Sequence, residues 1–305
     1  MQIRNISRSY GALAIGVVAI AWSAIFVRWA QMPGVTSGFY RMLIASMVLW
    51  PMLLGSKVKV SGCRRCVYML AALSGVFFAG DIALFNTAVM RTSAGSAMFL
   101  SNNAPLLVGL FTWAMTRRMP SGRYWTALAV ATAGAWLIIS ADVRHAASQW
   151  SADMLAMVAS VCFAMYLLLT ERLRREIDAR VLVTISATAS VATLLVVGVL
   201  ARLSFRVQSV QSLASLVAMA LVCQVMGYFC LAYALGQLPA TVTSVIMLAT
   251  APLTALFAFW IFGERMTVLK FAGGLLVMLG VWIVSRVPAE ATVVEENEAI
   301  LEVAG

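Results

Sequence analysis

The stretch Ser101-Asn102-Asn103-Ala104-Pro105 places three polar side chains and a proline inside an otherwise apolar run over residues 92–116. In a bilayer, an amide side chain without a hydrogen-bond partner is costly, so these side chains must face protein or a water-filled cavity. Asn103 is the better candidate for contact with a polar solute, because an amide cannot satisfy all its hydrogen-bonding groups within its own helix.

Asp81 is the carboxylate that lies deepest inside an apolar run. Counting inward from Arg91 places it about 15 Å from the end of its helix, near the middle of a bilayer. A charge at that depth is expensive and indicates a functional site by default. Three interpretations stay open: Asp81 binds a substrate ammonium group or a coupling proton, it forms a structural pair with Arg41, or it lies in a water-exposed position.

Other polar and aromatic side chains lie near the middle of apolar runs, where a cavity for a partly apolar solute needs its walls. The predicted substrate-binding set is Trp22, Asp81, Phe85, Ser96, Phe99, Asn103, Phe163, Gln224, Tyr228 and Thr250. Ser96, Phe99 and Asn103 share one helical face through spacings of three and four. The alternative for each hydroxyl or ring is local hydrogen bonding or plain packing between helices.

Membrane helices must position these residues. The 305 residues are 62% hydrophobic and 11% charged, against about 25% charged in an average soluble domain. The apolar residues form runs of about 20, the length of a helix that crosses the bilayer. We predict an all-α polytopic membrane protein with spans over residues 10–30, 35–54, 66–90, 93–116, 121–140, 150–171, 180–202, 211–236, 240–262 and 267–287.

The net charge of +10 has a topological explanation. Lys and Arg cluster in short segments between the apolar runs, as topology-setting charges do, and form no basic stripe of the kind that binds nucleic acid. With the N-terminus in the cytoplasm, 14 of the 22 basic residues lie inside, 7 lie outside, and Arg41 lies within a span. We expect both termini in the cytoplasm, and a small-molecule solute and lipid, not nucleic acid, as partners.

The chain repeats itself with a spacing of 147 residues, which pairs Pro105 with Pro252. The same spacing pairs Leu84 with Leu231, Trp113 with Trp260, and Arg118-Met119 with Arg265-Met266. Each half has five predicted spans, an odd number, so the halves enter the membrane in opposite orientations. Such inverted-topology repeats are typical of secondary transporters, with the binding site near the midplane. Pro105 and Pro252 are the predicted hinges.

The predicted organisation is a cytoplasmic N-terminus (1–9), a first repeat (10–141), a periplasmic linker (142–149), a second repeat (150–287) and a disordered acidic tail (288–305). Small residues line the fifth and tenth spans, where they allow close helix packing. They are Ala127, Ala131, Ala135, Gly273, Gly274 and Gly280. We expect these spans to act in scaffolding or self-association, which predicts a monomer or a weak homodimer.

Metal, cofactor and catalytic motifs are sparse. Cys63 and Cys66 form a lone pair without the further ligands that a structural zinc requires, and His145 is the one histidine. No phosphate-binding Gly-x-x-x-x-Gly-Lys-Ser/Thr loop occurs, which argues against direct ATP coupling within this chain. We expect no cofactor and no enzymatic activity.

Four motifs carry a family resemblance: residues 22–28 (Trp-Ser-Ala-Ile-Phe-Val-Arg), Phe39-Tyr40-Arg41, the two Ala-Pro-Leu segments, and Gly263-Glu264-Arg265. With them the chain resembles the drug/metabolite transporter superfamily, in its ten-helix EamA-like branch. It looks most like bacterial exporters of aromatic and other neutral amino acids, which implies alternating-access export across the inner membrane. The alternatives are a transporter of sugar phosphates, nucleotides or drugs on the same fold, a membrane scaffold or receptor, and an integral-membrane enzyme.

Overall fold

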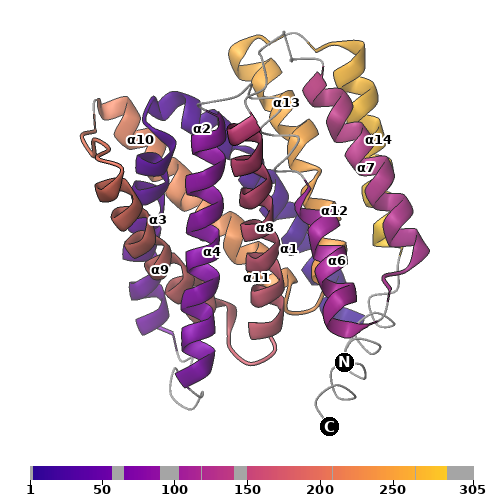
Figure 1. Ribbon diagram of the computed structural model, residues 1–305, viewed down its shortest axis with the longest axis horizontal. Coiled ribbons are helices and arrows are strands. Elements are labelled where there is room, and N and C mark those ends of the chain that lie inside the picture. Colours follow the sequence, from indigo (N-terminus) through magenta and orange to yellow (C-terminus); the bar gives the residue numbers. More distant parts are fainter. Residues whose placement is uncertain are drawn as a thin grey trace.

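The computed structural model describes residues 3–56, 65–89, 103–117, 119–140, 150–207, 209–264 and 266–286, and within these ranges every regular element is a helix. The first half contains α1 (Ile3–Ala21), α2 (Ser23–Ala30), α3 (Gly34–Leu54), α4 (Arg65–Val89), α6 (Ala104–Thr116) and α7 (Gly122–Ser140). The second half contains α8 (Trp150–Leu173), α9 (Ala179–Leu200), α10 (Val210–Ala218), the π-helix η1 (Met219–Tyr228), α11 (Phe229–Ala234), α12 (Ala240–Met247), α13 (Thr250–Phe262) and α14 (Val268–Ser285). Figure 1 shows these helices as a bundle.

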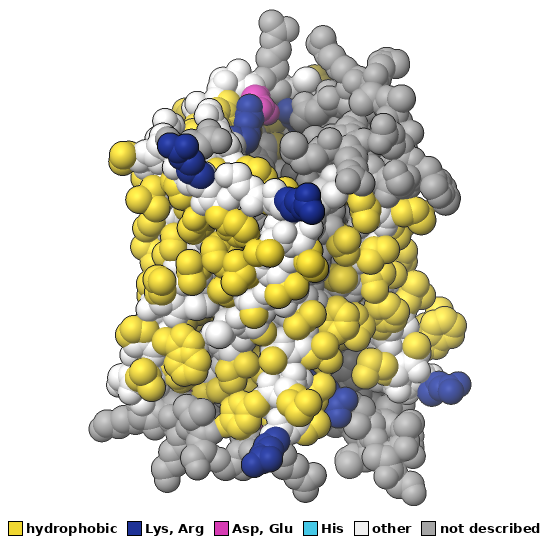
Figure 2. Space-filling view, turned by 60° about the vertical axis from the view of Figure 1, so that its left-hand side comes forward, with side chains coloured by type: hydrophobic (Ala, Val, Ile, Leu, Met, Phe, Trp, Pro, Cys, Tyr) yellow, Lys and Arg dark blue, Asp and Glu magenta, His cyan; other side chains and the backbone are white. Residues whose placement is uncertain are grey.

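The surface of the bundle is that of a membrane protein. Within the described ranges, eight helical stretches are long and apolar enough to cross a membrane, and α6 is a shorter apolar helix. Figure 2 shows a broad belt of apolar side chains between two rims that carry Lys and Arg. Large apolar side chains such as Leu200 and Trp260 are more than three-quarters exposed, which suits contact with lipid. The predicted all-α polytopic fold is confirmed.

The helix contacts repeat when the two halves are exchanged. α3 packs against its counterpart α9, and α7 packs against its counterpart α14. In the first half, α4 and α6 both pack against α8 of the second half. Their counterparts in the second half, α11 and α13, both pack against α1 of the first half. A pseudo-two-fold relation between the halves produces such pairs. It also brings helices from both halves together at the centre of the bundle.

Glycines let α7 and α14 lie in backbone contact. A Cβ atom added to Gly134 would lie 2.5 Å from the carbonyl oxygen of Gly273, and one added to Gly280 would lie 2.7 Å from the Ala131 Cβ. The predicted small-residue seam therefore joins two helices of the same chain. Its outer side, with Leu275 and Trp282, is exposed.

Two side chains at the end of α8 fix the turn between α11 and α12. The Glu171 carboxylate accepts a hydrogen bond of 3.0 Å from the backbone N–H of Ala240, the first residue of α12. The Arg174 Nε donates a 3.0 Å bond to the carbonyl of Ala232 near the end of α11. An anion at a helix start and a cation near a helix end both complement the helix dipole. This arrangement anchors the start of α12, which leads into the site described below.

We expect Gly134→Ala to lower the melting temperature of the detergent-purified protein by several degrees. The new methyl group must displace the backbone of α14, and overpacking typically costs about 1–3 kcal/mol. Gly11→Ala is the matched control, because a Cβ atom at Gly11 meets nothing within 4 Å and alanine favours helix. Thermal unfolding followed by tryptophan fluorescence compares the two; equal melting temperatures would contradict the backbone contact.

Candidate functional site

Three irregular helical segments meet inside the bundle. α1 ends at Ala21 and α2 begins at Ser23, α12 and α13 are separated at Leu248 and Ala249, and η1 interrupts the helix between α10 and α11. The Cys223 thiol of η1 donates to the Ala19 carbonyl at 3.2 Å, and the Thr254 hydroxyl of α13 donates to the Ala21 carbonyl at 2.9 Å. These bonds satisfy carbonyls next to the break in α1. Broken helices and π-helical turns often occur at functional sites in membrane proteins.

The predicted span over residues 240–262 is present, and it consists of two helices, α12 and α13, that meet at Leu248 and Ala249. Pro252 lies in the first turn of α13, where its missing N–H costs little. The Thr250 hydroxyl donates a 2.8 Å hydrogen bond to the Met247 carbonyl, which supplies that carbonyl with a partner at the break. Pro105 likewise lies in the first turn of α6; the preceding residues of the predicted span, 93–102, lie outside the described ranges.

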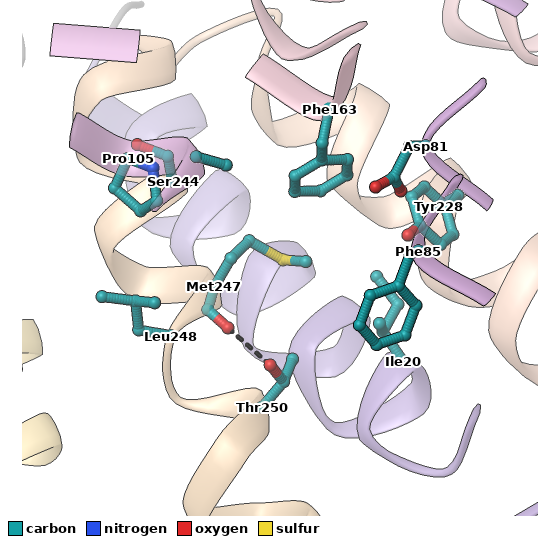
Figure 3. A pocket seen from close by; sticks show the side chains of 11 residues that line it. Ile20, Asp81, Phe85, Pro105, Phe163, Tyr228, Ser244, Met247, Leu248 and Thr250 are labelled. Atoms are coloured by element: carbon teal, nitrogen blue, oxygen red, sulfur yellow. Dashed lines mark hydrogen bonds between the residues drawn. The ribbon is translucent and has the colours of Figure 1, made fainter. Parts of the chain in front are cut away.

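A cavity of about 230 Å³ lies between the two halves, beside the break before α13 (Figure 3). It is lined by residues of α1, α4, α6, α8, η1, α12, α13 and the short segment between α12 and α13. These residues are Ile20, Asp81, Phe85, Ala104, Pro105, Phe163, Tyr228, Ser244, Met247, Leu248 and Thr250. The first five belong to the first half and the other six to the second, so relative movement of the halves would change its shape.

Asp81 gives the cavity its charge. In Figure 3 its carboxylate points toward the space between Phe163 and Phe85. The side chain is partly exposed, and it lines the cavity. Among the described residues, no Lys or Arg nitrogen lies within 4 Å of this carboxylate. The alternative of a direct ion pair with Arg41 is therefore not the arrangement seen, and the carboxylate is available to a cation in the cavity.

Aromatic side chains form the apolar walls. Phe85 lies one helical turn beyond Asp81, and Phe163 faces the cavity from α8 (Figure 3). Behind them, the buried Phe78 ring lies 4.6 Å from the Tyr228 ring and 4.7 Å from the Tyr166 ring, measured between centroids. These contacts pack the Tyr228 ring against other aromatic rings, and an aromatic wall suits a solute with an apolar or aromatic part.

Gln224 has a supporting position. Its Oε1 accepts a 3.1 Å hydrogen bond from Arg41 Nε, and both side chains are buried. Arg41 Nη1 also donates to the Ser23 hydroxyl at 3.3 Å. Gln224 therefore lies behind the cavity wall and contacts it through Arg41, whose guanidinium carbon lies 5.2 Å from the centroid of the Tyr228 ring.

Five of the ten residues predicted to bind substrate line the cavity: Asp81, Phe85, Phe163, Tyr228 and Thr250. Trp22, Asn103 and Gln224 do not line it, and Ser96 and Phe99 lie outside the described residues. Trp22 is the residue between α1 and α2 and stacks on Phe257 at 4.6 Å, and Asn103 precedes α6.

Sequence reasoning missed five lining residues: Ile20, Ala104, Ser244, Met247 and Leu248. Thr243, on a neighbouring face of α12, is fully buried and does not line the cavity. Met247 and Leu248 lie at the break between α12 and α13, where the regular spacing of a single helix no longer applies. The paired Ala-Pro-Leu segments were the one signal that could have indicated this break.

The fold and the cavity define a multi-pass membrane protein with a solute-sized space between two related halves. Residues 8–140 and 150–286 each match the EamA-like transporter family, and the chain belongs to this family of membrane transporters. It is 26% identical over 262 residues to the uncharacterized transporter YwfM of Bacillus subtilis, covering 85% of this chain and 86% of that protein. An uncharacterized transporter of Archaeoglobus fulgidus is 25% identical over 284 residues, covering 91% and 97%. A crystal structure with 15% identity superimposes with a TM-score of 0.79 over 92% of this chain and 97% of its own, which supports the fold alone.

We expect Thr250→Val to destabilise the protein by about 1–3 kcal/mol, because it removes the donor that the Met247 carbonyl uses at the helix break. Thr250→Ser keeps the hydroxyl and should retain most of the stability. Unfolding of the two variants in detergent, followed by tryptophan fluorescence, gives the comparison. Equal stabilities would show that this hydrogen bond does not support the break.

Proposed function

We propose that this transporter exports neutral and aromatic amino acids, and related small metabolites, across the bacterial inner membrane by alternating access. The observation that carries the proposal is the cavity between the halves, which combines one carboxylate with three aromatic side chains. In an amino acid, the ammonium group would bind Asp81, and the apolar side chain would lie against Phe85, Phe163 and Tyr228.

The size and charge of the cavity favour this class of solute. Its volume, about 230 Å³, is below the range of about 300–1,000 Å³ usual for drug-sized ligands. No Lys or Arg is among the described residues that line it, whereas a sugar phosphate or nucleotide needs several cationic groups around its phosphate. A small solute with a positive group fits this lining better.

Alternating access would use the two halves as the moving parts. Arg28 after the break in α1, and Glu264 after α13, form an exposed ion pair at 2.5 Å that joins the halves at one rim. Exposed ion pairs contribute little stability, so this contact can break without a large barrier. The orientation with both termini in the cytoplasm, proposed from the basic loops, would place this rim on the periplasmic side.

We expect purified protein in proteoliposomes to transport labelled neutral or aromatic amino acids, and Asp81→Asn to reduce that flux at least about tenfold, because a charge-assisted hydrogen bond is worth about 1.5–3 kcal/mol. Flux is measured with and without a pH gradient, using empty liposomes and Asp81→Glu as controls. Transport of another metabolite class without transport of any amino acid would reject the proposed substrates. Unchanged flux and pH dependence in Asp81→Asn would reduce Asp81 to a structural residue.

The aromatic wall gives a separate prediction on selectivity. Phe163→Ala should weaken transport of phenylalanine more than transport of alanine, because it removes ring contact that only the larger substrate makes. The ratio of kcat/KM for the two substrates is expected to fall about tenfold. Val158→Ala is the matched control, because Val158 lies on the same helix and its side chain is exposed. A parallel loss for both substrates would indicate that Phe163 only supports the fold.

A further inference from the structure

Arg41 is a buried cation whose hydrogen bonds are incomplete. Its residue surface is 7% exposed, and its Nη2 atom has no hydrogen-bond partner among the described residues. Buried polar atoms are nearly always paired, and a charge in a membrane interior is more expensive still. An unpaired guanidinium nitrogen at this depth therefore calls for an explanation.

The partners that Arg41 does have are neutral. Nε donates to Gln224 and Nη1 donates to Ser23, and no carboxylate in the described part of the chain lies within 4 Å of the guanidinium. These two bonds fix the plane of the group and leave Nη2 for a further acceptor. The planar fork of an arginine matches a carboxylate particularly well.

Arg41 also lies close to the cavity. Its guanidinium carbon is 5.2 Å from the centroid of the Tyr228 ring, and Tyr228 lines the cavity together with Asp81. The structure thus places the Arg41 guanidinium near the Tyr228 ring and the Asp81 carboxylate in the cavity that this ring lines, and the two charges resemble the charge separation of a zwitterion.

We propose that Arg41 is the anion-binding group of the transport site, and that the preferred substrates are zwitterions bound by Asp81 at the ammonium group and by Arg41 at the carboxylate. The inference rests on the proposed function for the ammonium contact and adds the carboxylate contact. Loading requires the Tyr228 ring to move aside, so that the substrate carboxylate reaches Nη2. Gln224 acts as a positioning residue, because it holds the guanidinium from the same π-helix that carries Tyr228.

The test compares three ligands that share one aromatic ring: phenylalanine, phenethylamine, which lacks the carboxylate, and 3-phenylpropionate, which lacks the ammonium group. Their dissociation constants are measured on the purified full-length protein, as wild type and as the Arg41→Gln, Arg41→Lys and Asp81→Asn variants. We expect the wild type to bind phenylalanine at least about tenfold more tightly than phenethylamine, a ratio that corresponds to one charge-assisted hydrogen bond.

Arg41→Gln should weaken the binding of phenylalanine and leave the binding of phenethylamine unchanged, so that the ratio of their dissociation constants falls toward one. Asp81→Asn should weaken the binding of phenethylamine, which has the ammonium group, and leave the binding of 3-phenylpropionate unchanged. Arg41→Lys keeps the charge and should retain part of the preference, which guards against a loss caused by misfolding. An equal loss for all three ligands in Arg41→Gln would assign Arg41 a structural role and overturn the inference.

The wild-type protein alone also separates the two proposals. Equal affinity for phenylalanine and phenethylamine would overturn the role of Arg41 and leave the cation site at Asp81 standing. Binding of none of the three ligands would overturn the proposed function, and this inference with it.

Discussion

The structure depends on one constraint: a polar group in a membrane interior needs a partner or access to water. The carbonyls at the helix breaks receive side-chain donors, distant in the chain for Ala21, which accepts from Thr254, and local for Met247, which accepts from Thr250. Asp81 has no ion-pair partner among the described residues and instead faces the cavity. The same requirement that keeps the irregular backbone inside the bundle therefore leaves a charged, partly apolar space at its centre.

The two-fold relation of the halves explains where that space lies. α6 and α13 carry the Ala-Pro-Leu segments, and each packs against the first helical segment of the opposite half, α8 or α1. A proline lies in the first turn of each helix, and in the second half it marks the point where α13 follows α12. The cavity forms beside these two first turns, so its walls come from both halves and must move when the halves move.

Much of this fold could be predicted because length, apolar content and basic loops are local properties of the chain. The spacing between Pro105 and Pro252 is also a property of the sequence alone, and it indicates two related halves. The site was less accessible, because its decisive contacts join residues far apart in the chain. Gln224 could not be assigned to Arg41, 183 residues away, and the place of Ser244 in the cavity wall depends on how α12 packs in the bundle.

The central claim is that the cavity between the halves is the substrate site and opens to each side of the membrane in turn. The most direct measurement is the labelling of Met247→Cys, in an otherwise cysteine-free chain, by a membrane-impermeant maleimide added to either side of oriented vesicles. Met247 lines the cavity, so we predict labelling from both sides, slowed by a saturating concentration of the transported solute. Labelling from neither side, or labelling at the same rate with the solute present, would contradict the account.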